Sequence, residues 1–310
     1  MDRFLQLEPE LNKTLPSLVL RKQEPMKKHT AFRIGGPVRL MAFPKSVEEL
    51  AVLCRVSSAH GVKPYFMGNG SNLLVADDGL NELVIKLYDG FSAMRLLEGG
   101  ILFAESGVLL SQAAVFAKRN GLSGLEFAHG IPGTVGGAVI MNAGAYGGEM
   151  KDVVIRTEFC QADTGEAGFI SGSAHQFVYR GSAFSDGNRV ITGVYFQLEP
   201  GDPVEIGKKM EELSLRRRES QPLDLPSAGS TFKRPVGHYA AALIDQAGLK
   251  GFSVGGAQVS PKHAGFVVNT NHATCQDVLS LVEQVQRRVK EQFGVSLELE
   301  VKVWKSETKA

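Results

Sequence analysis

A run of nineteen uncharged residues, 130–148, limits what this chain can fold into. The run is long enough to cross a membrane, yet seven of its residues are glycine, and it also contains Pro132 and Asn142. Because glycine and proline are the poorest helix formers, we expect no membrane-spanning helix here. A segment so rich in glycine is instead expected to form a loop whose backbone approaches another group closely.

The overall composition is that of a folded globular protein and excludes several function classes. The 310 residues are 43% hydrophobic and 22% charged, and their number predicts about two domains. The formal net charge of +1 provides no overall field for nucleic acid or an anionic membrane. Glycine is in excess, with 35 residues against an average of about 7%. A small molecule is therefore the expected partner, and no nucleic acid, membrane or obligate protein partner is indicated.

The N-terminus and the cysteines bear on location and on metal binding. The first fifteen residues lack the basic start and apolar core of a signal peptide, so we expect a cytoplasmic protein. Cys54, Cys160 and Cys275 are widely spaced and match no zinc-binding pattern. We predict buried thiols and no metal site.

Capped amphipathic helices alternate with short strand-like segments along the chain. Ser46 is expected to cap a helix that ends at Gly61, and Thr274 is expected to cap a last helix that ends at Gly294. The alternation predicts α/β or α+β structure for the first 120 residues.

A domain boundary is predicted at the sequence Pro-Gly-Asp-Pro, which separates a first domain, 1–200, from a second, 201–310. The second domain is expected to end in a strand over 295–304. Apolar and polar residues alternate in this strand, which puts Glu298 and Glu300 on one polar face. That face contacts either water or an active site.

Two glycine-rich loops are candidates for binding a phosphate-bearing ligand. Residues 68–72 read Gly-Asn-Gly-Ser-Asn, and residues 130–137 begin the uncharged run. Glycine lets successive backbone N–H groups approach a phosphate. Neither loop matches a Walker sequence, and the first lacks the third glycine of the dinucleotide fingerprint. Each loop alone could be a turn without a ligand, but together they indicate a large, phosphate-bearing cofactor.

Six motifs, taken in order, resemble those of a known family. They are HTAFRIGG at 29–36, GNGSNLL at 68–74, GIPGTVGGAVIMNAGAYGGE at 130–149, YRGSAF at 179–184, AGSTFKRP at 228–235 and HAGFVVN at 263–269. The chain resembles the UDP-N-acetylenolpyruvoylglucosamine reductases, and its compact length resembles their type II branch. The resemblance implies an α+β fold. A two-subdomain FAD-binding part of the vanillyl-alcohol oxidase (PCMH) type would be followed by a smaller α+β substrate-binding domain.

The resemblance also implies that FAD is the cofactor and that the two loops and the segment after them bind it. The predicted cofactor-binding residues are Gly68, Asn69, Gly70, Ser71, Asn72, Leu73, Gly130, Pro132, Gly133, Thr134, Val135, Gly136, Gly137, Asn142 and Gly144.

The implied reaction is the NADPH-driven reduction of UDP-N-acetylenolpyruvoylglucosamine to UDP-N-acetylmuramate, a cytoplasmic step of peptidoglycan synthesis. Arg180 would face the substrate carboxylate, and Ser230 would donate a proton to the adjacent carbon. Glu300 matches the catalytic glutamate near the family's C-terminus. If protonated, it could hydrogen-bond the developing charge, and if ionised, it could only orient donors.

Tyr179, Lys233 and Arg234 match family positions near the substrate, and Lys233 also matches one near the NADPH phosphate. Many relatives have Asn where this chain has Arg234, so a charged contact is expected to replace an amide there. The substrate and both cofactors are anionic while the chain is nearly neutral, so the positive charge that binds them is expected to be local.

Two other functions stay open. Another FAD-dependent oxidase or dehydrogenase of the same superfamily, acting on a small alcohol or hydroxy acid, would share the first domain without needing Arg180, Ser230 and Glu300. A flavin- or nucleotide-sugar-binding protein would keep the fold and lack turnover.

Overall fold

The computed structural model describes residues 2–306, and its contacts divide the chain into two compact units. Unit 1 consists of the residues up to Lys22, Leu40–Asn69 and Glu82–Leu215, and unit 2 consists of Gln23–Arg39, Gly70–Asn81 and the residues from Arg216 onward. Two early segments of the chain thus belong to the same unit as its C-terminal part. The functional domains 1–200 and 201–310 stay a prediction.

The helices begin and end close to the predicted capping residues. They are α1 (Phe4–Thr14), α2 (Val47–Ala59), α3 (Leu110–Arg119), α4 (Val135–Ile140), α5 (Pro203–Ser220), α6 (Ala240–Gln246) and α7 (Cys275–Phe293). The Glu49 N–H donates to Ser46 Oγ at 3.2 Å, and the Asp277 N–H donates to Thr274 Oγ1 at 3.0 Å. Gly294 ends α7 with a φ of 71°. The two helices expected from these caps are confirmed.

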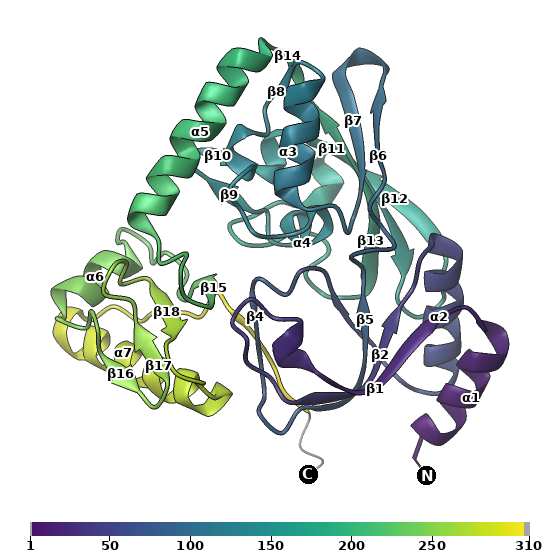
Figure 1. Ribbon diagram of the computed structural model, residues 1–310, viewed down its shortest axis with the longest axis horizontal. Helices are drawn as coiled ribbons and strands as arrows, with labels where there is room; N and C mark the ends of the chain where they lie inside the picture. The colour runs from purple at the N-terminus through teal and green to yellow at the C-terminus, as the bar shows by residue number, and fades with distance from the viewer. Residues whose placement is uncertain (1, 307–310) are drawn as a thin grey trace. The chain divides into compact units, whose positions relative to one another are not determined.

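Unit 1 contains an antiparallel sheet with the strand order β12-β11-β13-β7-β6 (Figure 1). These strands are Ala167–Ser171, Val154–Gln161, Arg189–Gln197, Ile101–Glu105 and Met94–Leu97. Buried side chains of α3 and α4, including Leu110 and Val139, share one hydrophobic core with Val194 and Phe196 of β13. The short pairs β8–β14 (Leu122–Ser123, Glu199–Pro200) and β9–β10 (Gly144–Ala145, Gly148–Glu149) complete the strands that surround this core.

Unit 2 contains a smaller antiparallel sheet with the order β15-β18-β17-β16. These strands are Ser227–Ser230, Phe266–Asn269, Ala257–Val259 and Ser253–Val254. The apolar stripe of α7, which includes Val278, Leu281 and Val285, shares a core with Val259 and Val267 of this sheet. The strands β4 (Leu73–Val75) and β19 (Lys302–Trp304) pair in parallel.

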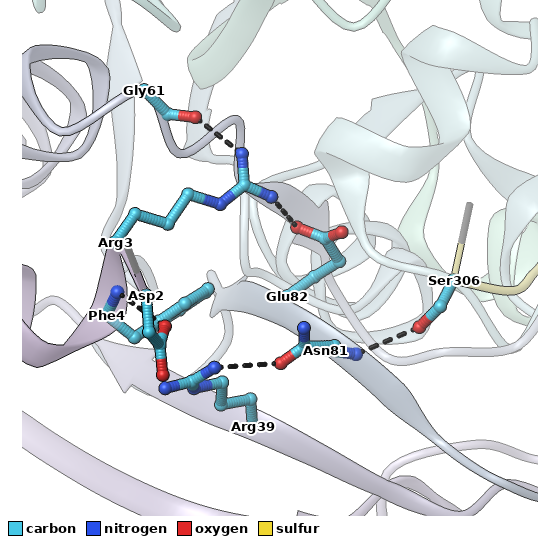
Figure 2. Close-up of polar contacts among 8 residues, drawn as sticks. All are labelled: Asp2, Arg3, Phe4, Arg39, Gly61, Asn81, Glu82 and Ser306. Carbon is cyan, nitrogen blue, oxygen red and sulfur yellow. Dashed lines mark hydrogen bonds and ion pairs between the residues drawn. The ribbon is translucent and has the colours of Figure 1, made fainter. Parts of the chain in front are cut away.

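A further sheet has the order β1-β2-β5-β3, with strands Val19–Pro25, Pro37–Phe43, Leu80–Lys86 and Tyr65–Met67. Figure 2 shows polar contacts of residues near it. In unit 1, Arg3 donates to the Gly61 carbonyl at 2.7 Å and forms an ion pair with Glu82 at 3.3 Å. In unit 2, Asn81 accepts from Arg39 at 3.0 Å, and its N–H donates to Ser306 Oγ at 2.9 Å.

The last strand is shorter than the sequence predicts. We expected a strand over 295–304, but β19 contains only Lys302–Trp304. The apolar alternation is correct, since Leu297 and Val301 are buried and Glu298 is exposed. The predicted strand was too long because residues 298–300 pair instead with residues 231–233, through two backbone hydrogen bonds and one bridge.

The uncharged run folds as a loop, the six-residue helix α4 and the β9–β10 hairpin. Within residues 2–306, none of the helices has the length and apolar character needed to cross a membrane. All three cysteines are buried and free, as predicted.

Candidate active site

The two glycine-rich loops meet within unit 1. A Cβ atom added at Gly68 would lie 2.3 Å from Thr134 Oγ1, a distance that no real side chain tolerates. The Asn69 side chain donates from Nδ2 to the carbonyl of Pro132 at 2.7 Å. Glycine is therefore needed at position 68 because the loops pack directly against each other.

Some backbone N–H groups of these loops are hydrogen-bonded to protein carbonyls and cannot bind a ligand. Val135 and Gly136 donate to the carbonyls of Val108 and Ser106, at 2.8 and 2.9 Å. A Cβ at Gly136 would lie 2.8 Å from the Ser106 Cβ, so this glycine is also required by packing within the protein.

The remaining N–H groups fit a phosphate-bearing cofactor. Within residues 2–306, those of Gly68, Asn69 and Gly133 donate to no protein acceptor. Backbone amides without protein acceptors, in loops too crowded for side chains, suit the diphosphate of a dinucleotide such as FAD. These three residues would hold it, whereas the amides of Val135 and Gly136 are engaged elsewhere.

The second part of the first loop belongs to unit 2. Gly70 has a φ of 66°, and its carbonyl accepts the Ala31 N–H at 3.1 Å. Asn72 donates from Nδ2 to the carbonyl of Glu300 at 3.3 Å and accepts the Lys302 N–H at 3.0 Å. A predicted cofactor residue thus holds the backbone of a predicted catalytic residue.

The other predicted loop residues differ in how exposed they are. That they contact the cofactor stays a prediction. Pro132 and Gly137 are exposed, whereas Ser71, Leu73, Gly130 and Gly144 are half-buried.

Asn142 is almost completely buried, with 2% of its surface exposed. Its Nδ2 donates to Glu149 Oε2 at 2.8 Å and to the Val178 carbonyl at 3.2 Å, and its Oδ1 accepts the Lys151 N–H at 3.0 Å. The side chain is therefore engaged with the protein, and its role toward the cofactor stays a prediction.

Arg180 lies in a tight turn of unit 1. Val178 and Gly181 exchange two backbone hydrogen bonds, of 3.0 and 3.2 Å, so Tyr179 and Arg180 occupy the corner. Arg180 has a φ of 57°, which is uncommon for a residue other than glycine. Its guanidinium lies 5.2 Å from the centre of the exposed Tyr179 ring. Neighbouring contacts must hold this turn in place.

Ser230 and Glu300 come from segments that pair within unit 2. The Glu300 N–H donates to the Thr231 carbonyl at 2.9 Å, and Phe232 forms a bridge with Leu299. Both Ser230 and Glu300 are half-buried. The structure therefore pairs two segments that lie far apart in the sequence, residues 231–233 and 298–300.

The same pairing extends to Lys233. Its N–H donates to the Glu298 carbonyl at 2.8 Å, and its ammonium forms an ion pair with the Glu298 carboxylate at 3.2 Å. Glu298 is mostly exposed, whereas Glu300 is half-buried. Arg234 stacks on Tyr239, with its guanidinium 3.9 Å from the ring centre. The Lys233 ammonium is thus paired with a carboxylate, whereas the Arg234 guanidinium lies over an aromatic ring.

His175 supports the segment that leads to Arg180. Its Nδ1 lies 2.9 Å from the Gly172 carbonyl, and its Nε2 lies 2.9 Å from Thr157 Oγ1. Since a carbonyl only accepts, Nδ1 carries the proton and Nε2 accepts from the hydroxyl. The His175 carbonyl accepts the Ala183 N–H at 2.8 Å. Burial lowers the pKa of His175 below its usual value of 6.5.

Comparison with known proteins defines the class first. A family model described as an FAD binding domain matches residues 38–167, which contain both glycine-rich loops. A second model, the C-terminal domain of UDP-N-acetylenolpyruvoylglucosamine reductase, matches residues 221–304, which contain Ser230 and Glu300. With the mixed helices and strands described above, these matches define an FAD-dependent oxidoreductase of α+β fold, as predicted.

Comparison of whole chains gives the family. A UDP-N-acetylenolpyruvoylglucosamine reductase of Caldanaerobacter subterraneus subsp. tengcongensis is 48% identical over 96% of this chain and 97% of its own. The same-named protein of Syntrophomonas wolfei is 44% identical over 93% and 96%. The crystal structure of the Thermus caldophilus reductase, at 38% identity, covers 93% of this chain and 99% of its own, with a TM-score of 0.79. The chain belongs to the UDP-N-acetylenolpyruvoylglucosamine reductase family.

Glu149, His175 and Ser182, which lie near the Arg180 turn or its contacts, were not among the predicted site residues. Glu149, the first charged residue after the uncharged run, forms an ion pair with Lys151 at 2.9 Å and accepts from Asn142. A single carboxylate at the end of a long uncharged run could have marked Glu149 as a residue with a specific polar partner. The contacts of His175 and Ser182 carry no comparable signal.

We expect Gly68→Ala to weaken FAD binding by about 1–3 kcal/mol, because the added methyl group forces the two loops apart. The dissociation constant of FAD for apoprotein measures this. Gly207→Ala is the matched control, since its Cβ meets only the flexible end of Lys118. Equal FAD affinity for Gly68→Ala and the wild type would contradict the described packing.

We expect the free energy of unfolding to fall as the pH drops below about 6.5, partly because of His175. Its pKa is lowered in the folded state, so below the usual pKa of 6.5 the unfolded chain binds a proton that the folded chain does not. One such group contributes at most about 1.4 kcal/mol per pH unit. Urea unfolding between pH 8 and 5 should give a shallower dependence for His175→Gln. The same slope in both proteins would refute the role of His175.

Proposed function

We propose that the protein reduces UDP-N-acetylenolpyruvoylglucosamine to UDP-N-acetylmuramate with NADPH, in the cytoplasm, as a step of peptidoglycan synthesis. The observation that carries the proposal is the near full-length identity to relatives named for this reaction. The pairing that joins the segments of Ser230 and Glu300 supports it, because an oxidoreductase of another substrate class has no need of that pair.

When bound, FAD takes a hydride from NADPH and supplies it to the enolpyruvyl double bond. The remaining chemistry is the task of the protein's own side chains. They must hold the substrate carboxylate, stabilise the negative charge that develops beside it and deliver one proton to the adjacent carbon.

Arg180 is the proposed ligand of the substrate carboxylate. Its planar guanidinium can donate two parallel hydrogen bonds to a carboxylate and offset the charge that develops when the double bond is reduced. The turn at Val178–Gly181 supports this role because it puts Arg180 at a corner, fixed by two backbone hydrogen bonds.

Ser230 is the proposed proton donor, acting from Oγ, and Glu300 is the proposed second catalytic residue. A serine hydroxyl is a weak acid, so a neighbouring group must assist the transfer. The hydrogen bond between the Glu300 N–H and the carbonyl of Thr231, the residue after Ser230, supports this pair of roles.

Lys233, Arg234 and Tyr179 are proposed to bind the phosphate-bearing part of the substrate, and Lys233 also the NADPH phosphate. Lys233 is held by Glu298, and Arg234 by the Tyr239 ring. Arg234 can donate several hydrogen bonds to phosphate oxygens.

The anaerobic redox cycle of the bound flavin tests the proposal. NADPH should bleach the yellow holoprotein, and UDP-N-acetylenolpyruvoylglucosamine should restore the colour. If a small alcohol or hydroxy acid bleaches the protein instead, the oxidase or dehydrogenase function is the correct one. If the enolpyruvyl substrate leaves the flavin reduced, the proposed reaction is wrong.

In the same experiment, Ser230→Ala should leave bleaching by NADPH unchanged and nearly abolish the return of colour, because the proton is needed only when the substrate is reduced. Ser227→Ala, in the same strand, is the matched control. An equal loss in both steps would argue that Ser230 has a structural role.

A further inference from the structure

The turn that carries Arg180 needs support from outside itself. Arg180 has a φ of 57°, and a left-handed backbone costs an ordinary residue roughly 1–3 kcal/mol, so it persists only where surrounding contacts impose it. The turn contains no glycine until Gly181. The groups that contact it therefore determine where the guanidinium is held.

Asn142 provides the first of these contacts. Its Nδ2 donates to the carbonyl of Val178, the residue that opens the turn, at 3.2 Å. The second N–H donates to Glu149 at 2.8 Å, and Oδ1 accepts the Lys151 N–H at 3.0 Å. An amide with 2% exposure and three partners has no freedom to rotate, since turning it would leave buried polar groups unpaired.

Ser182 provides the second contact, on the other side of Arg180. Its Oγ donates to the carbonyl of Ile140 at 3.1 Å, and Ser185 Oγ lies 3.5 Å from the same oxygen. Ile140 is the last residue of α4 and lies two positions before Asn142. The turn is thus tied on both sides to one short segment, 140–142.

The segment 140–142 continues directly from the glycine-rich loop. Helix α4 begins after Thr134, whose hydroxyl lies in the position that excludes a side chain at Gly68. The six-residue helix α4 therefore links the loop proposed to hold FAD to the segment that anchors the Arg180 turn. A rigid element of this length can fix one group relative to the other.

The charges near Asn142 keep its hydrogen bonds in one arrangement. Lys151 forms an ion pair with Glu149 at 2.9 Å. The Lys151 ammonium, with the Asn142 amide and the Arg180 charge, lowers the pKa of Glu149. Glu149 therefore stays ionised and can only accept, so the Asn142 amide must present its N–H groups to Glu149 and Val178.

We propose that Asn142 is a positioning residue for Arg180, acting through the Val178 carbonyl rather than by direct contact with the substrate. The inference rests on the proposed function of Arg180. It assigns Asn142 a role that differs from cofactor binding and predicts a different pattern of loss.

Single-turnover rates of both half-reactions, measured on the FAD-loaded full chain, test this. Asn142→Ala should leave flavin reduction by NADPH unchanged and slow flavin reoxidation by UDP-N-acetylenolpyruvoylglucosamine about 100-fold, the loss expected from misplacing a catalytic group by about 1 Å. In an Arg180→Ala background, adding Asn142→Ala should cause no further loss. Asn188→Ala removes an exposed side-chain amide that donates to Asp186 at 3.1 Å; it is the control and should match the wild type.

Two outcomes would overturn the inference. One is that Asn142→Ala loses FAD or slows both half-reactions equally. The other is that the double variant slows reoxidation by the product of the two single-variant factors. If Asn142→Ala does not fold, Ser182→Ala should show the same selective slowing to a smaller degree, and normal reoxidation in that variant would refute the inference. The rate of flavin reoxidation is measured first for the wild type. If the substrate does not reoxidise the wild-type flavin, the proposed function itself is refuted.

Discussion

Two close approaches of the backbone underlie the first unit, one at Gly68 and one at Gly136. At each, a single methyl group would collide with a neighbouring residue, Thr134 or Ser106. Both approaches involve the start of α4, because Thr134 is its N-cap residue and Gly136 lies in its first turn. Helix α4 leads directly to Ile140 and Asn142. The turn that presents Arg180 is built on those two residues. The glycine-rich run therefore does more than form the loop proposed to bind FAD, because it also supplies the hydrogen bonds to the turn that contains Arg180.

In the second unit, isolated backbone pairing rather than close glycine packing holds the predicted site residues in place. Ser230 stands at the end of a strand, and Glu300 stands in a segment that forms almost no regular sheet. A few backbone hydrogen bonds, from Glu300 to Thr231 and from Lys233 to Glu298, hold the two segments together. Such isolated pairing leaves the local backbone without the constraints of a full sheet, which suits the substrate-contacting roles proposed for Ser230 and Glu300.

Local signals in the sequence predicted local structure well, and long-range contacts escaped them. Ser46, Thr274 and Gly294 mark helix ends because capping depends on residues within one turn of the helix. The strand over 295–304 was predicted too long because alternation reports burial and not the identity of the pairing partner. The N–H groups of Val135 and Gly136 face protein carbonyls, which no pattern of glycines reveals. The family resemblance supplied the roles of Arg180, Ser230 and Glu300, whereas the support for Arg180 from Asn142 and Glu149 required the structure.

Analysis of the reaction product tests the central claim most directly. The FAD-loaded protein, given NADPH and UDP-N-acetylenolpyruvoylglucosamine, should form a product heavier than the substrate by two hydrogen atoms. Mass spectrometry should detect it, with one NADPH consumed for each product molecule. Recovery of the substrate with unchanged mass while NADPH is oxidised would contradict the account.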